Sequence, residues 1–155
     1  MEPVREYTYG IDEDGRIWCD GEWYDAPEIY RAFYETMTRD EGSGRLYATC
    51  MGERCWIDAV DTPFVVDFVN VETPDPSDAR SAKSVTLRLM GGVEEPLDPA
   101  TLRVGPDNVL YCRVKDARHE ARFLRPAYYE LMRHCVPGPE GTLVLPVGSL
   151  RVTLA

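Results

Sequence analysis

Hydrophobic residues along this chain follow two different spacings. Over residues 7–11 they fall at every second position, which is the period of a β-strand, and residues 17–24 resume as strand. Residues 12–15, Asp-Glu-Asp-Gly, lie between these runs and suit a turn. The pattern predicts a hairpin, and Asp20-Gly21 predicts a second tight turn that returns a short strand over residues 22–24.

The next segment changes to helical spacing. Asp25 is expected to cap this helix, with Pro27 in the first turn and Glu28 three residues after the cap, close to a capping box. Apolar or small residues then recur at i, i+3, i+4, i+7 and i+8, which predicts one buried stripe. The stripe consists of Ile29, Ala32, Phe33, Thr36 and Met37.

Alternating and turn-forming stretches continue to the end of the chain. Pro126 starts a second expected helix, over about residues 126–135, because proline fits the first turn. Residues 73–82 contain two prolines and no apolar pattern, so they predict a linker or long loop. We expect Tyr30, Tyr34 and Tyr129 at the core edge with hydroxyls that reach water. The other predicted strands cover residues 45–50, 55–60, 64–72, 84–90, 109–114, 119–124 and 142–154.

The order hairpin, helix, hairpin therefore occurs twice. Residues 26–37 and 121–132 share two Ala, one Tyr, one Glu and one Met at the same offsets. This similarity predicts an α+β fold with two tandem structural repeats, each a helix packed on antiparallel β-hairpins or sheet. We expect a single compact domain over residues 1–155, with one pseudo-repeat at about 7–72, the linker at 73–82 and the second pseudo-repeat at about 83–155.

Composition narrows the class of protein. With 44% hydrophobic and 28% charged residues among 155, the chain has the make-up of a globular domain. Its formal charge of -10 disfavours nucleic acid and anionic lipid as partners. No apolar run approaches the about 20 residues of a membrane helix, and the first residues lack a secretory signal. We therefore expect a cytoplasmic protein.

The chain contains five cysteines, an odd number that cannot pair completely. We expect free thiols in a reducing compartment. Cys50 and Cys55 could form a zinc site with Cys135, His134 or His119, but the second closely spaced ligand pair of structural zinc sites is missing. The sequence therefore predicts no metal and no cofactor.

A polar site, if there is one, is expected on the strand that contains His119-Glu120-Ala121-Arg122. Glu120 and Arg122 share one face of such a strand, and His119 lies on the other. These residues could hold an anionic ligand or form cross-strand pairs, and cross-strand pairing is the more common arrangement for charged residues on a strand. The matched helix residues Glu35 and Glu130 could in principle act as an acid and a base, but a surface role is favoured.

A set of residues and short motifs occurs in a fixed order along nearly the whole chain. They are Tyr9, Ile11-Asp12, Asp14-Gly15, Gly44-Arg45, Tyr47, Asp61-Thr62-Pro63-Phe64-Val65, Val114, Glu120-Ala121-Arg122 and Tyr128-Tyr129-Glu130-Leu131. This order resembles the bacterial family called domain of unknown function 1285. That resemblance implies a two-repeat α+β fold and no established activity, only suggestions of signalling or ligand binding. Two loops depart from the family pattern, at residues 49–53 and at Gly91-Gly92.

The resulting hypothesis is a bacterial, cytoplasmic, non-catalytic module that binds a small ligand or a protein and has a link to signalling. It has no predicted catalytic residues, and Glu120, Arg122 and His119 are its candidate ligand-binding residues. One alternative is an enzyme that acts on a small polar or anionic substrate with the same three residues. Another is a structural subunit of a homo- or hetero-oligomer, with exposed aromatic residues such as Trp23 as interface anchors.

Overall fold

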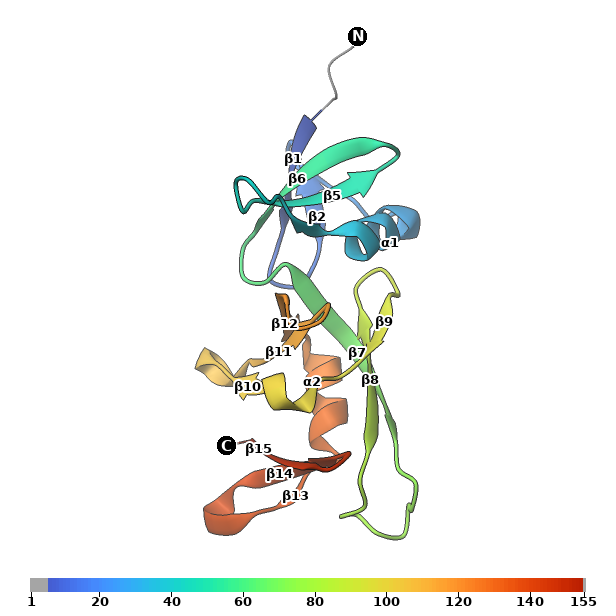
Figure 1. Cartoon of the computed structure of the whole chain (residues 1–155), viewed down its shortest axis with the longest axis vertical. Helices are drawn as coiled ribbons and strands as arrows, with labels where there is room; N and C mark the ends of the chain where they lie inside the picture. Colours follow the sequence, from blue (N-terminus) through green and yellow to red (C-terminus); the bar gives the residue numbers. More distant parts are fainter. Residues whose placement is uncertain (1–5, 155) are drawn as a thin grey trace. The chain divides into compact units, whose positions relative to one another are not determined.

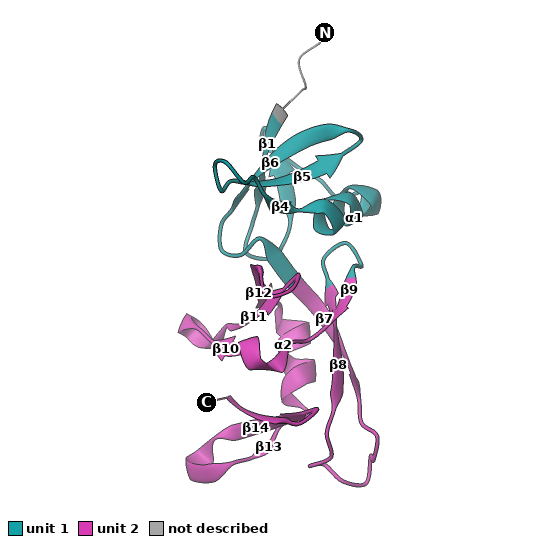
Figure 2. Ribbon diagram, viewed as in Figure 1, with its two compact units in different colours: residues 1–65, 89–93 teal, residues 66–88, 94–155 magenta. Residues whose placement is uncertain are grey.

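The computed structural model describes residues 6–154 and divides the chain into two compact units (Figures 1 and 2). Unit 1 comprises the chain up to Val65 together with residues 89–93, and unit 2 comprises residues 66–88 and the chain from Glu94 onward. Each unit contains one α-helix and its own strands. The predicted α+β class is therefore confirmed.

Unit 1 is built on a six-stranded sheet in the order β3-β2-β1-β6-β5-β4. The predicted hairpins β1–β2 and β5–β6 are both present, and they are joined by a parallel pairing of β1 with β6. The sheet is therefore mixed, whereas the sequence pattern led us to expect antiparallel strands alone. The strands are β1 (Glu6–Ile11), β2 (Ile17–Cys19), β3 (Glu22–Trp23), β4 (Thr38–Arg39), β5 (Leu46–Cys50) and β6 (Glu53–Ala59).

Helix α1 (Pro27–Thr36) packs on one face of this sheet, where the Phe33 ring meets the Tyr9 ring edge-on at 5.1 Å between centroids. The expected cap at Asp25 is wrong. The helix begins at Pro27, so Ala26 occupies the N-cap position with an extended backbone and makes no side-chain capping bond. Proline restricts the residue before it to extended conformations, which moves the helix boundary one residue beyond Asp25.

The buried stripe of α1 is rotated by about one residue from the predicted one. Tyr30, Phe33, Tyr34 and Met37 are buried, whereas Thr36 is exposed. The hydroxyl of Tyr30 accepts a hydrogen bond from the Ile17 N–H at 3.0 Å and donates to the Tyr24 carbonyl at 2.7 Å. Because backbone groups satisfy these hydroxyls, Tyr30 and Tyr34 lie in the core and do not reach water as expected.

The turn after β8 (Ser84–Leu89) belongs to unit 1. The Met90 N–H donates to the Val65 carbonyl at 2.9 Å. Gly91, with a φ of +88°, lies so close to α1 that a Cβ atom there would be 2.6 Å from the Tyr30 carbonyl oxygen. Glycine is required at this position both for its backbone conformation and for the close approach.

Unit 2 contains a second six-stranded sheet, in the order β10-β11-β12-β7-β8-β9, and a three-stranded sheet, β13-β14-β15. Residues 73–82 form the loop between β7 and β8, which are neighbours in the same sheet. The remaining strands are β7 (Phe64–Glu72), β9 (Glu94–Pro96), β10 (Arg103–Val104), β11 (Leu110–Val114), β12 (His119–Phe123), β13 (Val136–Pro137), β14 (Leu143–Val147) and β15 (Leu150–Leu154), with 3-10 turns at Pro99–Thr101, Pro106–Asn108 and Pro139–Gly141.

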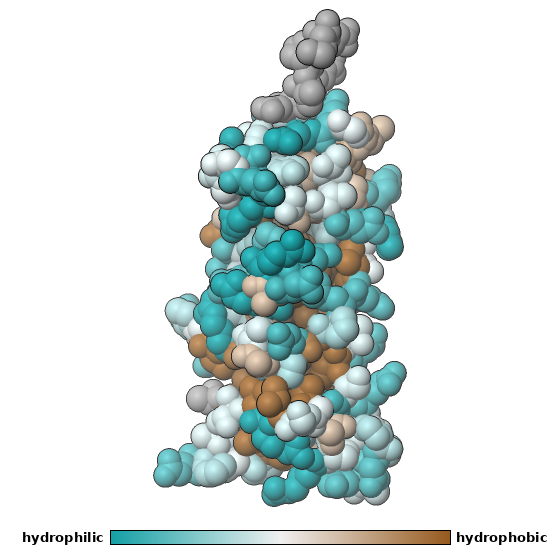
Figure 3. All heavy atoms as spheres, in the orientation of Figure 1, coloured by the Kyte–Doolittle hydropathy of each residue, from teal (hydrophilic) through white to brown (hydrophobic). Residues whose placement is uncertain are grey.

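Helix α2 (Arg125–Met132) contributes Ala127 and Leu131 to the buried interior of unit 2. It ends three residues earlier than predicted, because residues 136–137 pair with β14 as a strand. Side chains of β14 and β15 complete the interior, with Leu145 and Leu154 almost fully buried. On the side drawn in Figure 3, apolar residues gather over the part of unit 2 around β10 and β15. Exposed apolar area is ordinary on folded proteins, so this surface by itself assigns no partner.

The two stretches that suggested a repeat are not equivalent residue for residue. Ala26 is the N-cap of α1, whereas Ala121 lies in strand β12. Tyr34 is fully buried, whereas Tyr129 is 61% exposed. The order of elements nevertheless agrees, because each helix is followed by a two-residue strand and then a hairpin. The tandem repeat stays a prediction.

Within residues 6–154, neither helix combines the length and the apolar character that a membrane crossing requires.

Replacing Tyr30 with Phe should destabilise unit 1. The substitution removes the hydroxyl that accepts from the Ile17 N–H and donates to the Tyr24 carbonyl in a buried setting. A buried polar group that loses its partner costs about 1–3 kcal/mol. We expect a loss of this size in the free energy of unfolding measured with urea. Tyr129→Phe, at an exposed ring, should change it by less than about 0.5 kcal/mol. Equal effects from the two variants would contradict the buried role of Tyr30.

Candidate functional site

The predicted polar site lies on β12, and its three residues do not face the same way. Arg113 pairs with Glu120 and Val114 with His119 across β11 and β12. Glu120 and Arg122 share one face, as expected, while His119 is 5% exposed and points to the buried side with Ala121. The structure therefore does not bring His119 together with Glu120 and Arg122, and the enzyme alternative gains no common site.

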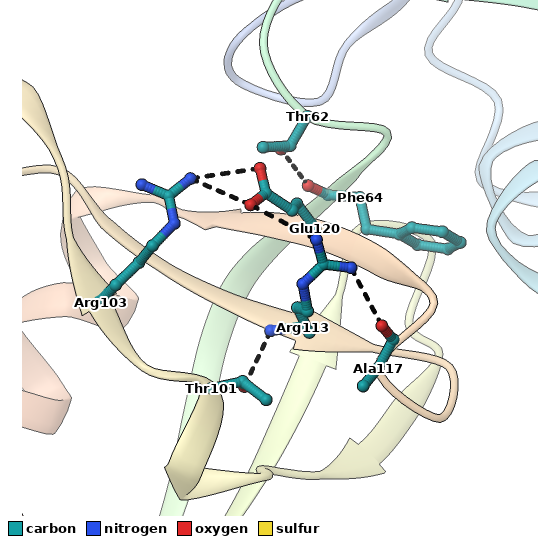
Figure 4. Close-up of polar contacts among 7 residues, drawn as sticks. All are labelled: Thr62, Phe64, Thr101, Arg103, Arg113, Ala117 and Glu120. Carbon is teal, nitrogen blue, oxygen red and sulfur yellow. Dashed lines mark hydrogen bonds and ion pairs between the residues drawn. The ribbon is translucent and has the colours of Figure 1, made fainter.

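Glu120 is held by arginines of neighbouring strands (Figure 4). Arg103 Nη2 lies 3.1 Å from Glu120 Oε1 and 3.2 Å from Oε2, and Arg113 Nη2 lies 4.0 Å from Oε1. Arg113 also donates to the Ala117 carbonyl at 3.0 Å, and the Arg113 N–H donates to the Thr101 hydroxyl at 2.9 Å. These contacts are those of an ordinary cross-strand network. They use both carboxylate oxygens of Glu120.

The two matched helix glutamates form ion pairs within their own helical segments. Glu35 lies 2.8 Å from Arg31 one turn away. Glu130 lies 2.7 Å from Arg133 and 3.4 Å from His134. Partial burial raises the pKa of Glu130, but hydrogen bonds from Arg133 and His134 outweigh it and hold this pKa below its usual value. Such charged, paired carboxylates match the surface role that the sequence favoured.

All five cysteines are free thiols. Burial raises the pKa of Cys55 to about 11, that of Cys135 to about 11 and that of Cys112 to about 12. Cys50 is half-buried. Among residues 6–154 no group of three or more His, Cys, Asp or Glu side chains is placed to hold a metal ion.

The solvent side of the unit 1 sheet carries an unusual group of aromatic side chains. All three tryptophans of the chain lie on this side, opposite α1, together with Tyr47. Trp18 is 39% and Trp23 is 51% exposed. We call this surface the aromatic face, and it consists of Trp18, Trp23, Tyr47 and Trp56 with Arg16, Arg45 and Arg54.

Strand register places these rings together. Trp18 pairs with Trp23 across β2 and β3, and Tyr47 pairs with Trp56 across β5 and β6, with ring centroids 5.7 Å apart. Strand β1 lies between the two pairs, because Gly10 is opposite Trp18. The parallel register of β1 with β6 then puts Trp56 on the same side of the sheet.

Arginine side chains cover several of the rings. The guanidinium carbon of Arg16 lies 4.4 Å from the centre of the Trp23 ring, and that of Arg45 lies 4.5 Å from the Trp56 ring. That of Arg54 lies 4.4 Å from the Tyr47 ring. These distances are in the range of cation–π interaction. The stacked arginines hold positive charge on this face in a chain whose formal charge is -10.

Gly10 allows the Trp18 ring to lie along the sheet. An ideal Cβ at position 10 would be 2.0 Å from Trp18 Cε2 and Nε1. Any side chain larger than hydrogen would therefore lift the indole off β1. This glycine fixes the orientation of one aromatic residue of the face.

Analysis of the sequence singled out Trp23 but missed the face as a whole. A signal was available, since Arg16-Ile17-Trp18 at the start of β2 and Arg54-Cys55-Trp56 within β6 repeat the pattern Arg-x-Trp. Residues two apart on a strand share a face, so each pattern puts an arginine and a tryptophan on the same side of the sheet. The meeting of the two patterns on one surface depends on the pairing of β1 with β6, which local periodicity does not reveal.

The chain thus has an α+β fold, with the aromatic face on unit 1 and the Glu120–arginine network on unit 2. No protein-family model matches the sequence, and no curated protein matches it. Two solved structures share its fold. A DUF1285 family protein from Silicibacter pomeroyi DSS-3 is 22% identical with a TM-score of 0.70, and the match covers 99% of this chain and 83% of that chain.

A DUF1285 family protein from Shewanella baltica OS155 is 13% identical with a TM-score of 0.59, and the match covers 81% of this chain and 91% of that chain. The resemblance to the domain of unknown function 1285 family is thus confirmed at the level of the fold. Neither structure is described with an activity, so the comparison adds no chemistry.

Cys50 should react first with a thiol reagent such as Ellman's reagent at neutral pH. Burial raises the pKa of Cys19, and the pKa values of Cys55, Cys112 and Cys135 are about 11 to about 12, so little thiolate forms at these four positions near pH 7. We expect one fast equivalent in the native protein, its loss in Cys50→Ser, and five equivalents in denaturant. A fast phase that survives Cys50→Ser would contradict this assignment.

Gly10→Ala should displace Trp18 and shift the intrinsic fluorescence toward that of a more solvated indole, because the new methyl group would occupy the position of the ring. Gly42→Ala is the matched control, since the nearest atom to a Cβ there is Asp40 Oδ2 at an ordinary 3.5 Å. An unchanged emission spectrum for Gly10→Ala would show that Trp18 does not lie over Gly10.

Proposed function

We propose that this protein is a non-catalytic binding module whose aromatic face docks an acidic segment of a protein partner. The observation that carries the proposal is the placement of all three tryptophans, with Tyr47, on one solvent-facing side of the unit 1 sheet. Tryptophan is seldom exposed on surfaces that contact only water, because contact of its large apolar ring with water is unfavourable.

A protein partner fits the residue types on this face. Trp, Tyr and Arg are the side chains that most often dominate the energy of protein–protein interfaces. Here the aromatic residues lie on four strands, β2, β3, β5 and β6, and form a broad surface, not an enclosed cavity. A broad surface with rigid aromatic side chains loses little side-chain entropy when it is covered by a second protein.

Charge favours an acidic partner. Arg16, Arg45 and Arg54 contribute three positive charges to the face, against Asp58 of β6 on the same side and Asp40, whose Oδ1 lies 3.6 Å from Arg54 Nη1. Carboxylates of a partner could accept hydrogen bonds from the guanidinium edges while the rings keep their stacking contacts. The rest of the chain is strongly acidic, so an acidic segment would be directed to this face and away from other surfaces.

Two further parts of the proposal concern origin and location. A tandem-repeat origin is supported by the order helix, two-residue strand and hairpin, which occurs after both α1 and α2. A cytoplasmic location is supported by five unpaired thiols, since a reducing compartment preserves free cysteines.

The proposal is tested by selecting peptides from a displayed random library on the full-length chain and titrating the enriched peptides in solution. All three tryptophans lie on the aromatic face, so a change in intrinsic fluorescence with tryptophan-free peptides reports on this surface. We expect the enriched peptides to be rich in Asp and Glu. Trp23→Ala should weaken their binding at least tenfold, because loss of an interface tryptophan commonly costs about 2 kcal/mol or more.

The matched control is Tyr129→Ala, which removes an exposed ring from unit 2 and should leave binding unchanged. Replacing Glu with Gln in an enriched peptide should also weaken binding if charge contributes. Enrichment of basic or neutral peptides, or equal binding to Trp23→Ala and the unmodified chain, would overturn the acidic-partner proposal.

A further inference from the structure

A pocket of about 290 Å³ lies in unit 2 between the β7–β8 loop and the end of α2. The loop contributes Thr73, Pro76 and Ala79, and the helix end contributes residues 133–136. Lys83 lies just before β8 and lines the same pocket. No carboxylate side chain is among the residues that line it.

Lys83 is unusual because its side chain is charged and buried. The residue is only 4% exposed. Its Nζ donates to the Ala79 carbonyl at 2.9 Å and to the Ser81 carbonyl at 2.8 Å. Within residues 6–154 no carboxylate forms an ion pair with this ammonium. An ammonium has three donors, so the two neutral carbonyls use two of them and supply no counter-ion.

The backbone of Lys83 is held by hydrogen bonds to the segment around the end of β14. The Lys83 N–H donates to the Pro146 carbonyl at 2.9 Å, and the Gly148 N–H donates to the Lys83 carbonyl at 3.2 Å. Lys83 thereby forms a parallel bridge with Val147 at the end of β14. This anchoring holds the charged side chain under the β7–β8 loop.

The remaining polar groups of the pocket also donate hydrogen bonds. Arg133 and His134 line it, and both contact Glu130, which is not part of the lining. The nearby loop carboxylates are already used locally. Asp75 accepts from Ser77 at 2.6 Å, and Asp78 accepts from the Arg80 N–H at 2.9 Å. The pocket lining therefore contains the donor groups of Lys83 and Arg133 and no carboxylate.

We propose that this pocket binds a small oxyanion, a carboxylate or a phosphate group, through the ammonium of Lys83 with Arg133 at the rim. The anion would accept a hydrogen bond from the third N–H of the ammonium, and its negative charge would neutralise the buried positive charge. The volume is at the lower end of ligand pockets, which suits a small molecule. The site lies in unit 2 and is independent of the aromatic face of unit 1.

A purely structural role for Lys83 makes a different prediction. The two hydrogen bonds to carbonyls hold the backbone of residues 79–83 in place, and this stabilising role requires no anion. If it were the whole role, adding an oxyanion would leave the pocket residues unchanged. Binding of an anion at this place therefore separates the two explanations.

The experiment is an NMR titration of the ¹⁵N-labelled full-length chain with inorganic phosphate and, separately, with succinate. Sodium chloride keeps the ionic strength constant, so that non-specific screening does not vary. We expect saturable shifts at the amides of residues 79–83 and 133–136 with at least one of the two anions. A response to phosphate alone or to succinate alone identifies the class of oxyanion. No saturable shift with either anion would overturn the proposal.

Lys83→Met keeps the length of the side chain and removes its charge, and it should weaken binding at least tenfold. Arg133→Gln provides a second variant at a mostly exposed side chain, should Lys83→Met fail to fold, and it should weaken binding several-fold. Arg118→Gln removes an exposed charge elsewhere in unit 2 and serves as the matched control. Undiminished binding in Lys83→Met, or in Arg133→Gln where the first variant does not fold, would exclude this pocket as the site.

Discussion

The parallel pairing of β1 with β6 is the contact on which unit 1 depends. Each of the two hairpins could form locally, but neither alone has enough strands for a stable sheet. The pairing runs in register from Glu6 opposite Arg54 to Ile11 opposite Ala59. It joins the hairpins into one sheet and creates the continuous surface that α1 covers. It also places the Trp18–Trp23 and Tyr47–Trp56 pairs of the opposite surface on either side of β1.

The two faces of that sheet accommodate aromatic rings in different ways. On the buried face, the α1 tyrosines direct their hydroxyls to backbone groups, so large rings fill the core without leaving polar atoms unsatisfied. On the solvent face, guanidinium groups stack on the rings and shield part of their apolar area. Unit 2 contains two charged groups in different surroundings. Glu120 forms ion pairs with Arg103 and Arg113, whereas the buried ammonium of Lys83 contacts neutral carbonyls.

Local patterns in the sequence predicted most individual elements and less of the candidate sites. The hairpin turns at residues 12–15 and 20–21 were identifiable because glycine and aspartate favour the required backbone conformations. The set of buried residues on α1 was not predicted correctly. Tyr30 and Tyr34 are core residues because backbone groups of distant residues form hydrogen bonds with their hydroxyls. Similarly, the alternation of β12 correctly separated His119 from Glu120, but the arginine partners came from β10 and β11.

The sequence by itself determined the α+β class, the hairpins and the two helices, since these depend on spacing and turn chemistry within short windows. It also carried the likeness to the domain of unknown function 1285, which the fold bears out. Only the tertiary structure decided which hairpins join, which rings face water, and that the ammonium of Lys83 is enclosed. These properties depend on contacts between residues far apart in the chain, and no local period encodes them.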